Sequence, residues 1–253
     1  MNPAGDPPVY DEAPAEPVPS YPFWGYEDLG MFVGMILPSV LLAVLLIAGG
    51  GMIWPAFFKR PVVQTLGGQL LTYAFAFGGL RQLFAARYDR PLLRSLGWRI
   101  SFPGALWAAL AGPVLAYSIG LLGMTLKAPL LKNPFETMMQ STLEVAAVGL
   151  FAVLLGPLAE ELVFRGFLLP LLTRSLGPVA AVGLTALLFA LLHGPQYSWA
   201  WQHVALVGSA GVVFGITRLW TRSTASSFVM HATYNLFFFG IALLQRSTFP
   251  EPI

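Results

Sequence analysis

Long uncharged apolar runs dominate this sequence and restrict the folds open to it. Six such runs are broken only by three histidines, and they cover residues 31–58, 61–80, 100–126, 145–159, 175–217 and 223–245. A helix needs about 20 mostly apolar residues to cross a membrane, and no run shows the alternation typical of barrel strands. We therefore predict an all-α, polytopic membrane helical bundle of about seven (six to eight) transmembrane helices.

The composition agrees with a membrane protein. Hydrophobic residues make up 56% of the chain and charged residues only 10%, whereas charged residues make up about 25% of soluble domains. The net charge of +2 gives no reason to expect nucleic acid as a partner, and the absence of cysteine excludes disulfides and thiolate chemistry. The expected spans are 31–57, 62–86, 103–125, 143–173, 178–193, 204–220 and 226–245.

The beginning of the chain differs from the rest. Its first 30 residues hold seven prolines and six acidic residues but no Lys or Arg, which predicts a disordered tail rather than a signal peptide. We expect three regions: a disordered, Pro- and acid-rich cytoplasmic tail at 1–29, N-terminal transmembrane helices at 30–140, and catalytic helices at 141–246.

Arginines suggest an orientation in the membrane. Arg87, Arg90, Arg94 and Arg99 lie between the second and third expected spans, so the positive-inside rule places this loop and the N-terminus in the cytoplasm. Arg outnumbers Lys by 11 to 3, and Ala, Gly and Pro are abundant, which indicates a GC-rich bacterial genome. The expected location is the bacterial inner membrane.

Three charged residues lie inside the apolar sequence, in the stretch LAEELVFRG at 158–166. Each costs about 2.5–3.5 kcal/mol at the centre of a membrane helix. Glu161 and Arg165 are spaced i, i+4 and can form an ion pair on one helix face. Glu160 is rotated by about 100° from Glu161 and has no such partner nearby. It is the residue that a purely structural interpretation leaves unexplained.

Two further polar pairs occur at helical spacing. In Phe189-x-x-x-His193 an aromatic ring precedes the imidazole by one turn and can fix its rotamer. In His231-x-x-x-Asn235 an imidazole and a carboxamide share one face, so that two donors can point at one oxygen.

Helix lengths predict which of these residues can meet. If residues 175–178 form the turn of a helical hairpin, Glu160 and His193 both lie roughly 25 Å from that turn and can face each other. The same reasoning leaves His231 far from His193 in depth, because His231 comes only about five residues into its span. A re-entrant segment near 222–228 or a different number of spans would remove this conflict.

Together these groups could hydrolyse a peptide bond. A carboxylate in a medium of low dielectric is suited to act as a general base, so Glu160 with His193 could deprotonate a water molecule. His231 and Asn235 could then donate hydrogen bonds to the oxyanion that forms. Because no nucleophilic Ser or Cys stands at an obvious place, direct attack by water is the simplest chemistry.

The three motifs, in this order between about 145 and 239, resemble those of the CAAX protease and bacteriocin-processing family, also called the Abi or Rce1-like family, of intramembrane endopeptidases. The resemblance implies that Glu160 and His193 activate water, that His231 and Asn235 form the oxyanion hole, and that Glu161 and Arg165 support the site. The implied substrate is a membrane-associated peptide or protein with a CAAX-like C-terminus, a sorting signal or a bacteriocin-type sequence. Membrane lipid is the other expected partner.

Other interpretations remain open. We expect no required cofactor, but Glu160, His193 and His231 could alternatively bind a catalytic zinc ion, although the HExxH motif is missing. A serine mechanism at Ser209 is weaker, because small residues in a span usually mean close packing. Outside enzymes, the same polar groups could serve a catalytically idle scaffold or a proton- or ion-coupled transporter. The sequence leaves the oligomeric state open.

Overall fold

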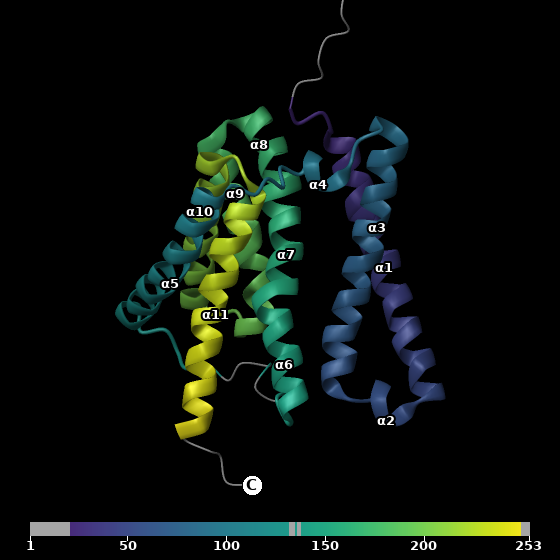
Figure 1. The fold of residues 1–253 in the computed structure, drawn as a ribbon, viewed down its shortest axis with the longest axis vertical. Coiled ribbons are helices and arrows are strands. Elements are labelled where there is room, and N and C mark those ends of the chain that lie inside the picture. Colours follow the sequence, from purple (N-terminus) through teal and green to yellow (C-terminus); the bar gives the residue numbers. More distant parts are fainter. Residues whose placement is uncertain (1–20, 132–134, 136–137, 249–253) are drawn as a thin grey trace, which may run out of the picture.

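The computed structural model describes residues 21–131, 135 and 138–248. The structure is 85% helical and contains no strand in the part that is described, so the prediction of an all-α fold is confirmed. The first half of the chain forms α1 (Tyr26–Ile53), α2 (Pro55–Phe58), η1 (Val63–Gly67), α3 (Gly68–Tyr88), α4 (Leu92–Ser95) and α5 (Phe102–Thr125). Helices α1 and α3 run side by side as an antiparallel pair (Figure 1).

The second half begins with one continuous helical rod and continues with three more long helices. The rod consists of α6 (Thr142–Leu150), η3 (Phe151–Leu155), α7 (Gly156–Glu161), η4 (Leu162–Leu168) and α8 (Leu169–Leu176). It is followed by α9 (Pro178–His193), the short 3-10 turn η5 (Gly194–Tyr197), α10 (Trp201–Thr221) and α11 (Thr224–Thr248).

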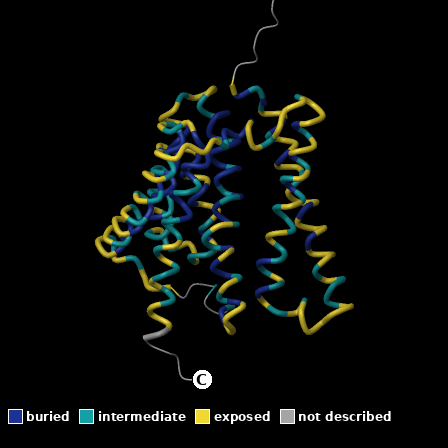
Figure 2. The backbone as a smooth tube through the Cα atoms, viewed as in Figure 1, coloured by how far each residue is buried: buried dark blue, intermediate teal, exposed yellow. Residues whose placement is uncertain are grey.

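Among the described residues, six helices are long and apolar enough to cross a membrane: 26–53, 102–125, 142–176, 178–197, 201–221 and 224–246. They coincide within a few residues with six of the seven predicted spans. The remaining predicted span, 62–86, corresponds to η1 and α3, whose length is similar but whose sequence is more polar. Figure 2 shows buried residues gathered among α7–α11, and apolar side chains of α1 such as Leu37 and Leu45 are exposed on the outside. A bundle of six to eight spans is thus confirmed.

Two wide π-helical turns interrupt the rod, and each is followed by a proline. The N–H of Gly156 bonds the carbonyl of Phe151, five residues back, just before Pro157. The N–H of Leu169 bonds the carbonyl of Phe164 in the same way, just before Pro170. Proline has no N–H and crowds the carbonyl four residues earlier, and a π-turn relieves that crowding by widening the helix. Glu160 and Glu161 lie between these two turns.

Helix α11 begins inside the protein rather than at the membrane surface. Thr224 is fully buried, its N–H bonds the Gly97 carbonyl, and its hydroxyl donates to the Leu96 carbonyl. The loop after α4 therefore covers the start of α11, which lies deeper than the turn between α8 and α9 (Figure 1). This removes the conflict in depth that the sequence predicted for His231. Residues 224–228 belong to α11 itself, so no re-entrant segment is needed.

Helix α11 is held in this position by close packing on α5. A Cβ atom added at Gly112 of α5 would lie 2.6 Å from the Met230 carbonyl and 2.9 Å from the Tyr234 nitrogen. Only a residue without a side chain allows this approach. The contact fixes the part of α11 that carries His231.

The expected disordered tail at 1–29 is wrong for its last nine residues. The side chain of Trp24 is fully buried, stacks on Phe167 of η4 and donates a hydrogen bond to the Phe167 carbonyl. Asp28 is buried within α1 and accepts a hydrogen bond from the Tyr88 hydroxyl. The prediction of disorder rested on the many prolines and acidic residues. The aromatic residues at 21–24 nevertheless supply enough apolar surface to pack against α3 and η4. Residues 1–20 lie outside the described part.

Replacing Trp24 by alanine should destabilise the protein by about 3–5 kcal/mol, because the change leaves a cavity between α1, α3 and η4. Thermal unfolding of the purified protein in detergent would measure the effect. Trp201→Ala is the matched control, since Trp201 is 63% exposed at the start of α10. Equal unfolding temperatures for the two variants would contradict the packing described for Trp24.

Candidate active site

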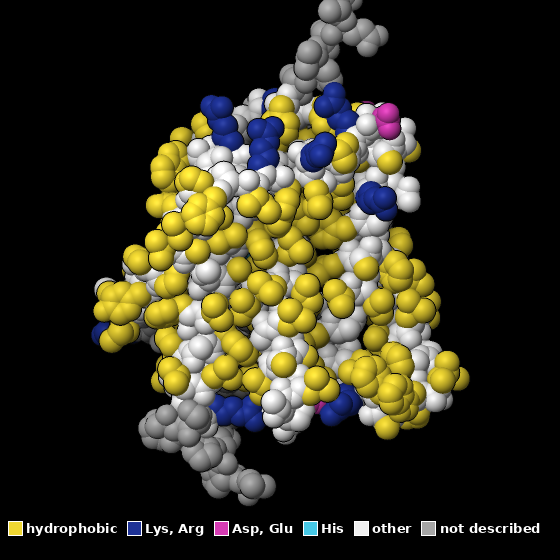
Figure 3. Space-filling view, viewed as in Figure 1, with side chains coloured by type: hydrophobic (Ala, Val, Ile, Leu, Met, Phe, Trp, Pro, Cys, Tyr) yellow, Lys and Arg dark blue, Asp and Glu magenta, His cyan; other side chains and the backbone are white. Residues whose placement is uncertain are grey.

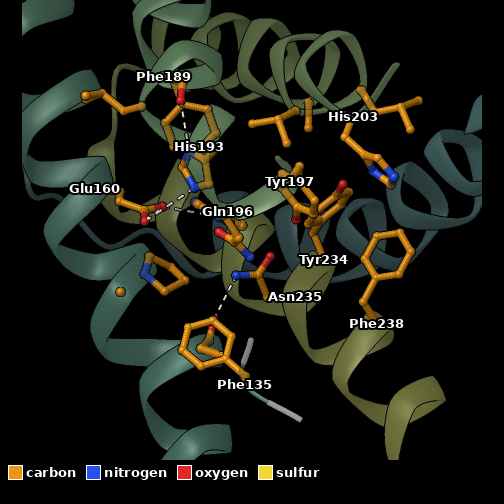
Figure 4. A pocket seen from close by; sticks show the side chains of 18 of the residues that line it. Phe135, Glu160, Phe189, His193, Gln196, Tyr197, His203, Tyr234, Asn235 and Phe238 are labelled. Carbon is orange, nitrogen blue, oxygen red and sulfur yellow. Dashed lines mark hydrogen bonds and ion pairs between the residues drawn. The ribbon is translucent and has the colours of Figure 1, made fainter. Parts of the chain in front are cut away.

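A cavity of ≈ 1180 Å³ opens in the middle of the bundle. Its wall is mostly apolar and comes from α1, α3, α5, the rod, α9, α10 and α11. Four residues proposed from the sequence line it together: Glu160 from α7, His193 from α9, and His231 and Asn235 from α11. Figure 4 shows Glu160, His193 and Asn235 at the cavity. The structure therefore joins all three sequence motifs in one place.

Beside the cavity, Glu161 and Arg165 form the expected ion pair. Arg165 Nη1 donates to Glu161 Oε1 at 3.0 Å, and both side chains have no exposed surface. Arg165 Nη2 donates to the Gly211 carbonyl of α10 at 2.9 Å. The guanidinium also lies over the rings of Phe189 and Phe214, with centroids at 4.7 and 5.3 Å, a geometry that favours a cation. These contacts offset part of the cost of burying the charge.

Glu161 connects this pair to α11. Its Oε1 lies 3.0 Å from Nδ1 of His231, and its Oε2 accepts a hydrogen bond of 2.6 Å from the Ser227 hydroxyl. The ring of Phe214 stacks on His231, with centroids 4.5 Å apart. A charged, paired Glu161 can only accept, so we assign the proton on Nδ1 to His231. Nε2 is then left free to face the cavity.

His193 is fixed in an equivalent way by its own helix. Its Nδ1 lies 2.8 Å from the carbonyl of Phe189, one turn earlier, and the Phe189 ring is 4.5 Å away. A carbonyl can only accept, so Nδ1 carries the proton and Nε2 faces the cavity. Both the carbonyl and the ring of Phe189 therefore contact the imidazole of His193.

Glu160 lies between the two imidazoles. Its Oε1 is 3.8 Å from Nε2 of His193, and its Oε2 is 3.7 Å from Nε2 of His231. Both distances exceed that of a hydrogen bond. Where a ring carries only its Nδ1 proton, its Nε2 presents a lone pair to the carboxylate, and a proton is then needed between these two atoms. A water molecule that donates to Glu160 and to one imidazole satisfies them.

Asn235 faces the rod from one turn after His231. Its Nδ2 donates to the carbonyl of Ala152 in η3 at 2.7 Å. Within a π-turn that carbonyl would bond the N–H of residue 157, but Pro157 has none. Asn235 thus satisfies an acceptor that the proline leaves open. The carboxamide has a second N–H, which is available to a group in the cavity.

The donor set can be compared with a zinc site. The two Nε2 atoms and the Glu160 carboxylate face one another, and Glu161 and the Phe189 carbonyl orient the rings as outer partners of metal-bound histidines do. Among the described residues, however, no group of three or more His, Cys, Asp or Glu is arranged to hold a metal ion. Zinc therefore stays an alternative that rests on residue types.

Some participants escaped the sequence analysis. Ser227 precedes His231 by four residues, so the series Ser227, His231, Asn235 along one helix face was a usable signal. Phe214 and the Gly211 carbonyl gave none, because their roles depend on how α10 packs. Ser209, considered as an alternative nucleophile, donates to the Ala205 carbonyl and does not line the cavity.

Comparison with known proteins agrees with this geometry. Residues 142–237 match the family model described as type II CAAX prenyl endopeptidase Rce1-like. The chain carries an Rce1-like domain. This Rce1-like domain begins with α6 and ends within α11, so it contains all seven residues named above from the three motifs. No curated protein and no solved structure matches the chain.

The family resemblance read from the motifs is confirmed. The Rce1-like domain implies a protease of the CAAX-type intramembrane class, with a peptide substrate and a lipid environment. The six apolar helices indicate, in agreement, an integral membrane protein.

A double-mutant cycle tests the buried ion pair. Arg165→Met should destabilise the protein by about 3–5 kcal/mol, because Glu161 would be left charged and unpaired in the core. The double variant Glu161→Gln, Arg165→Met should lose less, since no buried charge remains. Thermal unfolding in detergent measures these two variants and Glu161→Gln alone. If the loss of the double variant equals the sum of the losses of the two single variants, Glu161 and Arg165 are not coupled and the assignment is wrong.

Proposed function

We propose that this protein is an intramembrane endopeptidase that hydrolyses a peptide bond of a membrane-associated substrate with water activated by Glu160 and His193. The observation that carries the proposal is the position of the Glu160 carboxylate, 3.8 and 3.7 Å from two imidazole nitrogens, in a cavity surrounded by apolar helices. The match to the Rce1-like family supports the same class of activity.

In the proposed reaction, water is held between Glu160 and His193 and attacks the carbonyl carbon of the scissile bond. Glu160 accepts a proton from the water as the C–O bond forms. The tetrahedral intermediate then expels the amine, which takes the proton back from Glu160 as the C–N bond breaks. The products are a new carboxyl terminus and a free amine, and Glu160 returns to its starting state.

The oxyanion of the intermediate needs donors on the opposite side. The free N–H of Asn235 is one. His231 can be the second donor only if its Nε2 is protonated, because its Nδ1 proton already forms the hydrogen bond to Glu161. On this proposal, His231 therefore acts as an imidazolium between Glu160 and Glu161. Glu161, Arg165 and Phe189 keep the two imidazoles in place.

We further propose a bacterial inner-membrane location with the N-terminus in the cytoplasm. In this view more Lys and Arg side chains lie at the end of the molecule that holds α4 and the turn after α8 than at the opposite end, which also carries some, and hydrophobic side chains cover the middle (Figure 3). This distribution is what the positive-inside rule predicts for a cytoplasmic face. The proposed substrates are membrane-associated peptides or proteins with a CAAX-like C-terminus, a sorting signal or a bacteriocin-type sequence.

Replacing Glu160 by glutamine should abolish cleavage, with a loss of at least about a hundredfold, because an amide cannot accept the proton from water. Comparative proteomics of membrane-protein C-termini would measure this loss of cleavage, by comparing cells that carry the native chain with cells that carry Glu160→Gln. Uncut termini should accumulate only with the variant.

Glu27→Gln provides the control, because Glu27 is exposed and forms its ion pair with Arg87 at the surface. Its termini should equal those of the native chain. If native cells and Glu160→Gln cells have identical termini while both proteins are folded, the proposed base is wrong. A scaffold or an ion-coupled transporter would then be the better interpretation.

Chelation tests the zinc alternative. We expect the purified protein to keep its peptidase activity after exhaustive treatment with a metal chelator, since Glu160 and His193 can activate water without a metal. The measurement is cleavage of a quenched fluorescent peptide before and after chelation. Loss of activity that added Zn²⁺ restores would assign the metal to Glu160, His193 and His231.

A further inference from the structure

Arg218 is a buried cation in the last turn of α10, outside the site described above. It is only 6% exposed. Its guanidinium donates from Nε to the Thr224 hydroxyl at 3.0 Å and from Nη2 to the Tyr21 hydroxyl at 2.8 Å. Gly97 leaves room for it, since a Cβ atom at Gly97 would lie 2.6 Å from Nη2. Three separate segments of the chain therefore surround this guanidinium.

Arg218 has no carboxylate partner. None of the ion pairs in the described part of the chain includes it. Glu27 and Asp28, acidic residues at the same end of the molecule, pair with Arg87 instead (Figure 1). A buried charge is normally paired, because its removal from water is costly. Arg218 therefore lacks the counter-ion that the buried Arg165 has.

Several donors at Arg218 are still free. A guanidinium has five N–H groups, and the two bonds to Thr224 and Tyr21 use two of them. Nη1 makes no hydrogen bond within the described residues, and it is not among the side-chain atoms that are closed off from the surface. The Tyr21 hydroxyl accepts from Nη2 and makes no described bond with its own proton. These donors can converge on the oxygens of one anion.

The position of Arg218 favours phosphate as that anion. Arg218 comes three residues before the end of α10, a helix long and apolar enough to cross a membrane. It lies beside the loop after α4, at the end that carries more of the Lys and Arg side chains in Figure 3. A helix end of this kind lies near the lipid headgroups, where the anions are mainly phosphates, and basic pockets at this depth bind anionic headgroups.

We propose that Arg218 binds a phosphate group, supplied by an anionic phospholipid of the adjacent leaflet. The free N–H groups of Arg218 and the Tyr21 hydroxyl donate to the phosphate oxygens, while Nε and Nη2 keep their described bonds. The bound phosphate stabilises the contact between the segment before α1 and the start of α11. Arg218 does not line the central cavity, and the inference does not depend on the proposed peptidase activity.

The test is thermal unfolding of the full chain in a non-ionic detergent with phosphatidylglycerol, phosphatidylcholine or inorganic phosphate added. Phosphatidylglycerol should raise the unfolding temperature by about 5–10 °C when its concentration is about a hundred times its Kd. Phosphatidylcholine should raise it less, because its headgroup carries a cation that Arg218 repels. An equal rise with inorganic phosphate would overturn the lipid as the source and assign free phosphate to Arg218.

Variants locate the effect. Arg218→Gln should abolish the difference between the two lipids, and native mass spectrometry should show that it loses a bound phosphatidylglycerol. Arg218→Lys keeps the charge without the planar fork, so phosphatidylglycerol should bind about tenfold more weakly. This second variant decides the matter if Arg218→Gln does not fold. Arg222→Gln is the matched control, because Arg222 follows α10 directly and is exposed.

The control should respond to phosphatidylglycerol as the native chain does. If Arg218→Gln and Arg218→Lys keep the native shift and the native number of bound lipids, the inference is wrong. It is also wrong if Arg222→Gln loses as much of the shift as Arg218→Gln, since the lipid would then respond to the overall charge of this face. A native chain that responds to none of the three additives would show that Arg218 has no phosphate ligand.

Discussion

The buried ion pair between Glu161 and Arg165 is the interaction on which the site depends. Two fully buried charges in an apolar bundle are tolerated only with good mutual geometry and further partners. Those partners come from other helices: the Gly211 carbonyl of α10, and His231 and Ser227 of α11. Satisfying one pair therefore fixes three helices relative to one another. The orientation of His231 toward the cavity follows from that requirement.

Adjacent carboxylates thus have different environments, although both belong to α7. The helix turns about 100° per residue, so Glu161 points into the core and Glu160 into the cavity. Glu161 is fully satisfied by Arg165, His231 and Ser227, and it orients an imidazole. Glu160 lies 3.8 and 3.7 Å from the Nε2 atoms of His193 and His231, which leaves room for a water molecule between them. Two prolines, through the π-turns that precede them, set these directions within one long helix.

Much of the fold could be predicted, because a membrane span is a local property of about 20 residues. The i, i+4 spacing of Glu161 and Arg165 was also enough to predict their pairing. Two expectations failed for identifiable reasons. The aromatic residues at 21–24 pack on the bundle, although their surroundings are rich in proline and acid. His231 reaches the site because α11 starts beneath the loop at 96–97, whereas the sequence suggested a start at the membrane surface.

The sequence by itself determined the class of fold, the number of spans within one, and the residues of three motifs on their helix faces. These features depend on contacts within a single helix. Only the tertiary structure decided which nitrogen of each histidine faces Glu160 and which carbonyl accepts a hydrogen bond from Asn235. Such contacts depend on the tilt, depth and π-turns of separate helices, and no spacing along the chain encodes them.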